Sequence, residues 1–182
     1  MKKNKLVKSL ISLAFIVFIT LVACSSDPKT NQSAPVAQAK SSKSIQSVQP
    51  EFSDLKVKQV YGSYIQLKNA MFNANEVQVK SAALSLKTAL TAVSNSKGAD
   101  LSNKIASAPS LEVQRGLLTS VSAEVEKVIK GSKLASGIVY KQFCPMANDG
   151  NGGYWLASES TIKNPYYGDQ MSSCGSVKEE IN

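Results

Sequence analysis

The chain contains 182 residues, with 21 Lys plus Arg, 13 Asp plus Glu and no His, and its formal net charge is +8. The absence of His excludes Ser-His-Asp and Cys-His catalytic relays and also excludes imidazole metal ligands. No general base, activated nucleophile or cofactor motif is evident elsewhere in the sequence, so we expect a protein that is not an enzyme. Any metal site must use Cys, Met or oxygen ligands.

The N-terminal segment has the order of features typical of a bacterial lipoprotein signal. Its basic start contains Lys2, Lys3, Lys5 and Lys8. Residues 10–22 form a mostly apolar run, which is shorter than the about 20 residues of a spanning helix but suits a signal peptide. The run ends in Leu-Val-Ala-Cys24, which resembles the lipobox before which such signals are cleaved. We therefore expect residues 1–23 to be a signal peptide and Cys24 to carry lipid, which would anchor a periplasm-facing or outer-membrane protein of the cell envelope.

Cleavage at this point also changes the charge. It removes four of the 21 basic residues and none of the 13 acids, which leaves 17 minus 13, or +4. The chain has a single Arg, Arg115, and its lysines are scattered rather than gathered in a stripe with stacking aromatic residues. A nucleic-acid partner is therefore not expected.

Residues 24–50 predict a flexible tether that follows the lipidated Cys. Ser, Gln, Ala, Lys and Pro dominate this segment, and large apolar residues are nearly absent. Such a composition buries too little surface to order itself. The folded domain is expected to span residues 51–182, which is long enough for one hydrophobic core.

Apolar residues recur at spacings of three and four in the first part of this domain, which predicts amphipathic helices. Helices are expected at residues 54–73 and 76–94, and a third long helix is expected to begin after Ser110 and to stop at Gly131. The intervening residues 95–109 are polar and contain Gly98 and Pro109, so only a short helix is expected there, at residues 101–105. The predicted fold is mainly α, an antiparallel three- to four-helix bundle.

Residues 138–182 lose the helical period and predict a loop-rich cap with short strands. Ile138-Val139-Tyr140 is expected to be extended, and Asn164-Pro165-Tyr166-Tyr167-Gly168 is expected to form a turn. The cap contains the only Trp of the chain, Trp155, which we expect to anchor it in the core. Both cysteines other than Cys24 also lie in the cap, so a local function is expected there.

Two short motifs in the cap combine Cys with Met. They are Cys144-Pro145-Met146 and Met171-Ser172-Ser173-Cys174. If the two motifs meet, two thiolates and two thioethers converge, and such a soft ligand set selects Cu(I) or Ag(I). The alternative is a structural Cys144–Cys174 disulfide, worth about 3–4 kcal/mol for a loop of about 31 residues, with Met146 and Met171 as core filler. The alternatives are compatible, because a dithiol can be switched between them by oxidation.

The C-terminal motifs resemble those of a bacterial family of unknown function, DUF3347. The family pattern in this region is C-P-M-A, G-x-W-L, I-x-N-P-Y-Y-G and M-x-x-C-G, and the run Tyr64 to Met71 resembles the family's first helix. The positions that fit are Cys144, Pro145, Met146, Trp155, Asn164, Pro165, Tyr166, Gly168, Met171 and Cys174. Ala157 and Ser172 depart from the pattern, and neither is a candidate ligand. The resemblance spans about residues 52–182.

This family occurs as small envelope proteins and as an appendage of periplasmic adaptor subunits in copper and silver efflux systems. The resemblance therefore implies metal handling and a heavy-metal efflux component as partner. The leading hypothesis is a lipid-anchored, non-enzymatic envelope protein that binds a soft metal ion through Cys144, Met146, Met171 and Cys174, for buffering or for handover to efflux. The alternative hypothesis is an envelope interaction module with a Cys144–Cys174 disulfide and no metal.

Overall fold

Helices make up most of the first two thirds of the described chain. The computed structural model describes residues 49–182. Its helices are α1 (Leu55–Phe72), α2 (Glu76–Ala92), α3 (Ser96–Ser107), α4 (Leu111–Gly116) and α5 (Leu118–Lys130). The mainly α class and the helices expected at 54–73 and 76–94 are confirmed. The predicted signal peptide, the lipidated Cys24 and the tether as far as residue 48 lie outside the described residues.

Side-chain caps explain where four of these helices begin. The Asp54 carboxylate accepts a hydrogen bond from the backbone N–H of Lys56 at 2.7 Å. Asn75 and Asn95 cap α2 and α3 in the same way, with acceptor distances of 3.0 and 2.8 Å, and Ser110 caps α4. Each cap pairs an N–H group that the first helical turn leaves without a partner.

The region around α3 to α5 differs from the prediction in two ways. First, α3 is longer than residues 101–105, because Gly98 lies inside the helix at a close contact between helices. A Cβ at Gly98 would lie 3.0 Å from the Leu90 side chain and 3.1 Å from Glu124 Cβ. Second, the expected third long helix is divided into α4 and α5 beside Gly116, a residue that weakens helices.

The expected loop-rich cap contains a three-stranded antiparallel sheet. Its strands are β3 (Val139–Cys144), β4 (Gly153–Ala157) and β5 (Ser176–Ile181), in the order β4-β3-β5. The extended segment predicted at 138–140 is therefore confirmed at Val139 and Tyr140, which begin the central strand. A separate two-stranded ladder joins β1 (Glu51–Phe52) to β2 (Leu134–Ser136).

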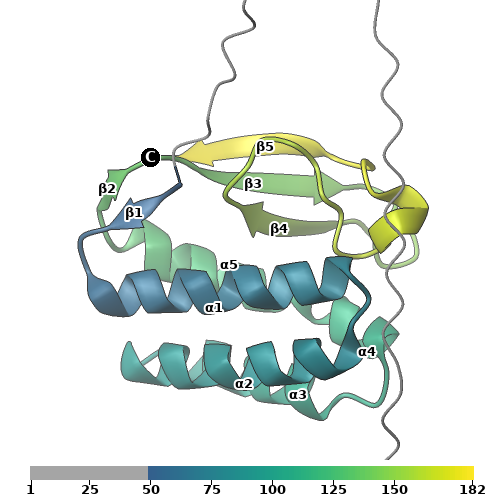
Figure 1. Cartoon of the computed structure of the whole chain (residues 1–182), viewed down its shortest axis with the longest axis horizontal. Coiled ribbons are helices and arrows are strands. Elements are labelled where there is room, and N and C mark those ends of the chain that lie inside the picture. The colour runs from purple at the N-terminus through teal and green to yellow at the C-terminus, as the bar shows by residue number, and fades with distance from the viewer. Residues whose placement is uncertain (1–48) are drawn as a thin grey trace, which may run out of the picture. The chain divides into compact units, whose positions relative to one another are not determined.

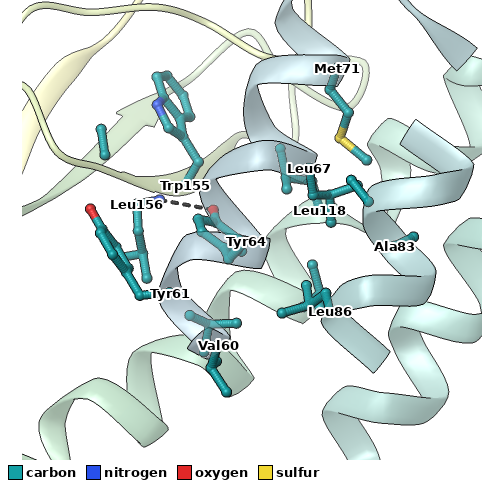
Figure 2. Packing of buried hydrophobic residues seen from close by; sticks show 14 of the residues in the cluster. Val60, Tyr61, Tyr64, Leu67, Met71, Ala83, Leu86, Leu118, Trp155 and Leu156 are labelled. Carbon is teal, nitrogen blue, oxygen red and sulfur yellow. Dashed lines mark hydrogen bonds between the residues drawn. The ribbon is translucent and has the colours of Figure 1, made fainter. Parts of the chain in front are cut away.

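The three-stranded sheet lies over α1 and α5, and α2 and α3 lie on the other side of these helices (Figure 1). One core connects these layers, as Figure 2 shows for side chains of α1, α2, α5 and β4. Trp155 is fully buried, as predicted, and its indole Nε1 donates a hydrogen bond to Gln142 Oε1 at 2.8 Å. Gln142, also fully buried, donates in turn to the backbone oxygen of Glu159 at 2.7 Å. The sheet is thus built into the helical domain.

Helix hydroxyl groups cover the outer edge of β4. The Leu156 N–H donates to the Tyr64 hydroxyl at 2.9 Å (Figure 2). That hydroxyl donates to Ser122 Oγ at 2.7 Å, because Ser122 Oγ itself donates to the Leu118 carbonyl. Burial raises the pKa of Tyr64, so the hydroxyl keeps the proton that it donates. Two residues earlier, the Tyr154 N–H donates to Thr119 Oγ1 at 3.1 Å. The Tyr154 and Leu156 N–H groups at this edge are therefore hydrogen-bonded to helix side chains, and no further strand is needed to pair them.

Tyr64→Phe is expected to destabilise the domain by about 1–3 kcal/mol, because it leaves the buried Leu156 N–H without an acceptor. The measurement is urea unfolding followed by circular dichroism. The matched control is Tyr140→Phe, at a half-buried tyrosine on β3 that takes no part in this chain of hydrogen bonds. An equal loss of stability in both variants would show that the Tyr64 hydroxyl has no special role.

Candidate functional site

The sheet brings the two predicted cysteines together. Cys144 is the last residue of β3, and Cys174 lies just before β5. These strands are antiparallel, and Phe143 pairs with Ser176, so the two cysteines meet at one end of the sheet. Both are free thiols; Cys144 is buried and Cys174 is half-buried. The pKa of the Cys174 thiol is raised, mainly by a hydrogen bond with the Cys144 thiol and to a smaller extent by burial.

Each candidate methionine is joined to its cysteine by one backbone turn. The Ala147 N–H donates to the Cys144 carbonyl at 3.4 Å, which places Met146 within that turn. Met171 ends the short 3-10 helix η1 (Gly168–Met171), and its carbonyl accepts from the Cys174 N–H at 3.1 Å. Met146 is 53% exposed, whereas Met171 is half-buried. The four predicted ligands therefore range from an exposed thioether to a fully buried thiol.

Among residues 49–182, no cluster of carboxylates joins the two thiols to complete a metal site. Within residues 49–182, no group of three or more His, Cys, Asp or Glu side chains is arranged to hold a metal ion. A site at the two thiols would therefore need thioether, carbonyl or external donors to complete its coordination.

Tyr167 is a site residue that the sequence did not reveal. Its hydroxyl donates a hydrogen bond to the Met146 carbonyl. Burial raises the pKa of this phenol most, and the negative charges that Cys144, Cys174 and Asp149 carry when ionised raise it further, so the phenol lies within electrostatic range of both thiols. In the sequence, Tyr167 is marked only as the second Tyr of the turn predicted at residues 164–168, which gives no indication of a place near the thiols. Tyr167 thus joins the loop that precedes Cys174 to the Met146 turn.

Asn164 fixes the segment that carries Cys174. Its side chain is fully buried, and Nδ2 donates to the Cys174 carbonyl at 2.8 Å. Its Oδ1 accepts from the Tyr166 N–H at 2.8 Å, and its own N–H donates to the Ser172 carbonyl at 2.9 Å. The turn predicted at 164–168 is present, and Gly168 closes it with a hydrogen bond to the Asn164 carbonyl at 3.0 Å. The position of Cys174 is therefore set by a buried polar side chain.

These observations define a helical domain whose attached sheet ends in two adjacent thiols. A family of proteins of unknown function, DUF3347, matches residues 60–137. The match confirms the predicted family likeness over residues 60–137, from α1 to β2, whereas the C-terminal Cys/Met motifs that carried most of the predicted resemblance lie beyond the matched residues. No curated protein matches the chain, and no solved structure matches it.

No helix among the described residues is long and apolar enough to cross a membrane. The predicted anchor at Cys24 precedes these residues, so it stays a prediction. The alternative prediction, a Cys144–Cys174 disulfide, also stays a prediction. The two cysteines lie close together, and both carry free thiols.

Proposed function

We propose that this protein binds one soft metal ion, Cu(I) or Ag(I), for buffering or for handover to a heavy-metal efflux component. The ion would be held by Cys144 and Cys174, with thioether ligands from Met146 and Met171. The protein would act without catalysis, anchored to an envelope membrane through lipid on Cys24. The observation that carries the proposal is the adjacency of two free thiols at one end of the sheet.

Three features of the surroundings support a soft-metal site. Thiolates and thioethers prefer Cu(I) and Ag(I) to hard cations. Asn164 holds the Cys174 backbone, and Tyr167 holds the Met146 backbone, so the ligand-bearing segments are positioned in advance. The exposed Met146 side chain could receive an ion that is then retained by the buried Cys144 thiol.

The test is an anaerobic titration of the reduced, full-length protein with Cu(I) against a chromophoric chelator. We expect about one Cu(I) per chain, and Cys144→Ser combined with Cys174→Ser should abolish binding, because both thiolates are lost. Cys24→Ser is the matched control for a cysteine outside the site and should leave binding unchanged. Met171→Leu should weaken binding, because one thioether ligand is lost, and Met71→Leu in the helical core is its matched control. Copper retention by the double serine variant would refute the proposal.

The affinity for Cu(I) should rise with pH from neutral to mildly alkaline solution. Metal binding displaces the thiol protons, and the raised pKa of Cys174 means that protons compete for this ligand throughout that range. The measurement is the same competition titration at a series of pH values, with Cys174→Ser as the comparison. An affinity that does not change with pH would argue against thiolate ligation.

The adjacency of the thiols also favours a second candidate, an interaction module locked by a Cys144–Cys174 disulfide. In that case both thiols would resist alkylation until reduction, and reduction would lower the melting temperature. Thiols that are fully alkylated in protein taken from the envelope would exclude this candidate.

A further inference from the structure

Arg115 carries a half-buried charge that no carboxylate balances. It is the single Arg of the chain and lies on α4. Its Nη2 donates to the Met71 carbonyl at 2.7 Å, but its Nε is buried without a hydrogen-bond partner. Burial lowers the pKa of Arg115, and no carboxylate among residues 49–182 forms an ion pair with it.

The lysines that are withdrawn from water, by contrast, are paired with carboxylates. Lys68 pairs with Glu159 at 3.2 Å, and Lys141 pairs with Glu126 at 2.9 Å. Buried or half-buried charges are usually paired in this way because desolvation is costly. Arg115 is the exception, and because it also lines a surface cavity, an anionic group from outside the chain could pair with its guanidinium N–H groups other than the buried Nε.

Arg115 lines a cavity of about 510 Å³ between α4 and the turn that follows β3. This volume lies within the usual range for small-molecule sites, roughly 300–1,000 Å³. The residues that give the cavity its chemical character are Glu112, Val113, Arg115, Asp149, Tyr166 and Tyr167. Glu112 and Asp149 form no ion pair within the described part of the chain, so the cavity presents unpaired charges of both signs.

We propose that this cavity binds a small zwitterion of the α-amino acid class. The carboxylate would pair with the Arg115 guanidinium, and the ammonium group would pair with Glu112 or Asp149. A side chain of apolar character would lie against Val113, which is 47% exposed, and the tyrosine rings. The two carboxylates disfavour a dianion such as phosphate, and the guanidinium disfavours a simple cation. The inference goes beyond the metal proposal and does not depend on it.

The test is an NMR titration of the full-length, metal-free protein with L-leucine, which lacks a soft donor atom. We expect saturable shifts at residues of the cavity with a Kd of about 1 mM or tighter. L-leucinol, which lacks the carboxylate, and N-acetyl-L-leucine, which lacks the ammonium group, should each bind at least about tenfold more weakly. Binding of either analogue as tight as that of L-leucine, or no saturable shift, would overturn the proposal.

Variants then assign the charges within the cavity. Arg115→Gln should weaken L-leucine binding about tenfold or more, because the carboxylate loses its charged partner. Glu112 is exposed, so Glu112→Gln tests the site even if Arg115→Gln fails to fold. Glu112→Gln combined with Asp149→Asn should also weaken binding, and Glu76→Gln on α2 is the charge-matched control. Unchanged affinity in the combined variant would refute the predicted ammonium subsite.

Discussion

Glu159→Ala is expected to destabilise the domain by about 3 kcal/mol, because it leaves the ammonium group of Lys68 buried without a counter-charge. The Lys68 side chain on α1 is 1% exposed, and its Nζ lies 3.2 Å from Glu159 Oε1. Removal of one partner of a buried pair costs about 3–5 kcal/mol, and the low end applies because Glu159 is 25% exposed and water can partly replace it.

The pH dependence of this variant identifies the cause. Desolvation lowers the pKa of Lys68 below its usual value in the folded protein, and loss of Glu159 would lower it further. Between that lowered pKa and the unfolded value of about 10.4, the unfolded chain binds more protons, so stability rises with pH. The stability lost in Glu159→Ala should therefore shrink as the pH rises from the further-lowered Lys68 pKa of the variant to the less-lowered pKa of the intact pair, because only the variant gains stability over that range.

Lys68→Met provides the matched control in chemical denaturation. It replaces the buried ammonium by an apolar side chain, which is often neutral or stabilising. Glu159 remains near Lys163 at 3.7 Å, so its charge is not left alone. The double variant Lys68→Met plus Glu159→Ala should regain most of the stability lost in Glu159→Ala and lose its pH dependence. If the double variant is as unstable as Glu159→Ala, the loss does not come from the stranded ammonium.

The longer helices could be predicted because each has one apolar stripe that faces a single core. Positions such as Tyr64 and Leu67 on α1 have this spacing and are fully buried. From the sequence alone, Gly98 predicts that the helix is interrupted, but α3 continues through it. Glycine is present there because only a residue without a side chain fits between Leu90 and Glu124 of the neighbouring helices. No local pattern records that contact.

The sheet was harder to foresee because its strands do not all alternate. In β4 four of the five residues are buried, because α1 and α5 pack against this strand and β3 pairs with one of its edges. The residues that satisfy its edge, Tyr64 and Thr119, lie in helices far away in the sequence. Both hydroxyls fall within the residues that match DUF3347, whereas β4 does not. Residues inside the matched region thus satisfy the edge of a strand that lies outside it.

The candidate site shows the same division between local and long-range information. Cys144 and Cys174 were identified by residue type, but their contact depends on the pairing of β3 with β5 across the intervening loop. Tyr167 could not be assigned, because its relation to the thiols follows from the fold of that loop. The sequence therefore predicts which atoms are chemically suited to a metal, and the sheet determines which of them meet.

Gly168 joins that loop to the end of α1, where a side chain has no room. It has a φ of +57°, in the left-handed region, and a Cβ there would lie 2.6 Å from the Phe72 carbonyl oxygen. That oxygen belongs to backbone at the C-terminus of α1, so a flexible side chain cannot relieve the contact. Gly150 offers a matched comparison, with a φ of +85° and no atom within 4 Å of a Cβ.

Gly168→Ala is therefore expected to destabilise the domain by about 2–4 kcal/mol, which combines the left-handed strain with the forced shift of backbone. Gly150→Ala should cost only about 1 kcal/mol, because strain is its sole penalty. The measurement is urea unfolding of both variants. Since the loop from Asn164 to Cys174 would be displaced, Gly168→Ala should also weaken Cu(I) retention more than Gly150→Ala does. Equal destabilisation by the two variants would mean that the loop moves away from α1 at little cost, and that its contact with the helix does not hold Cys174 in place.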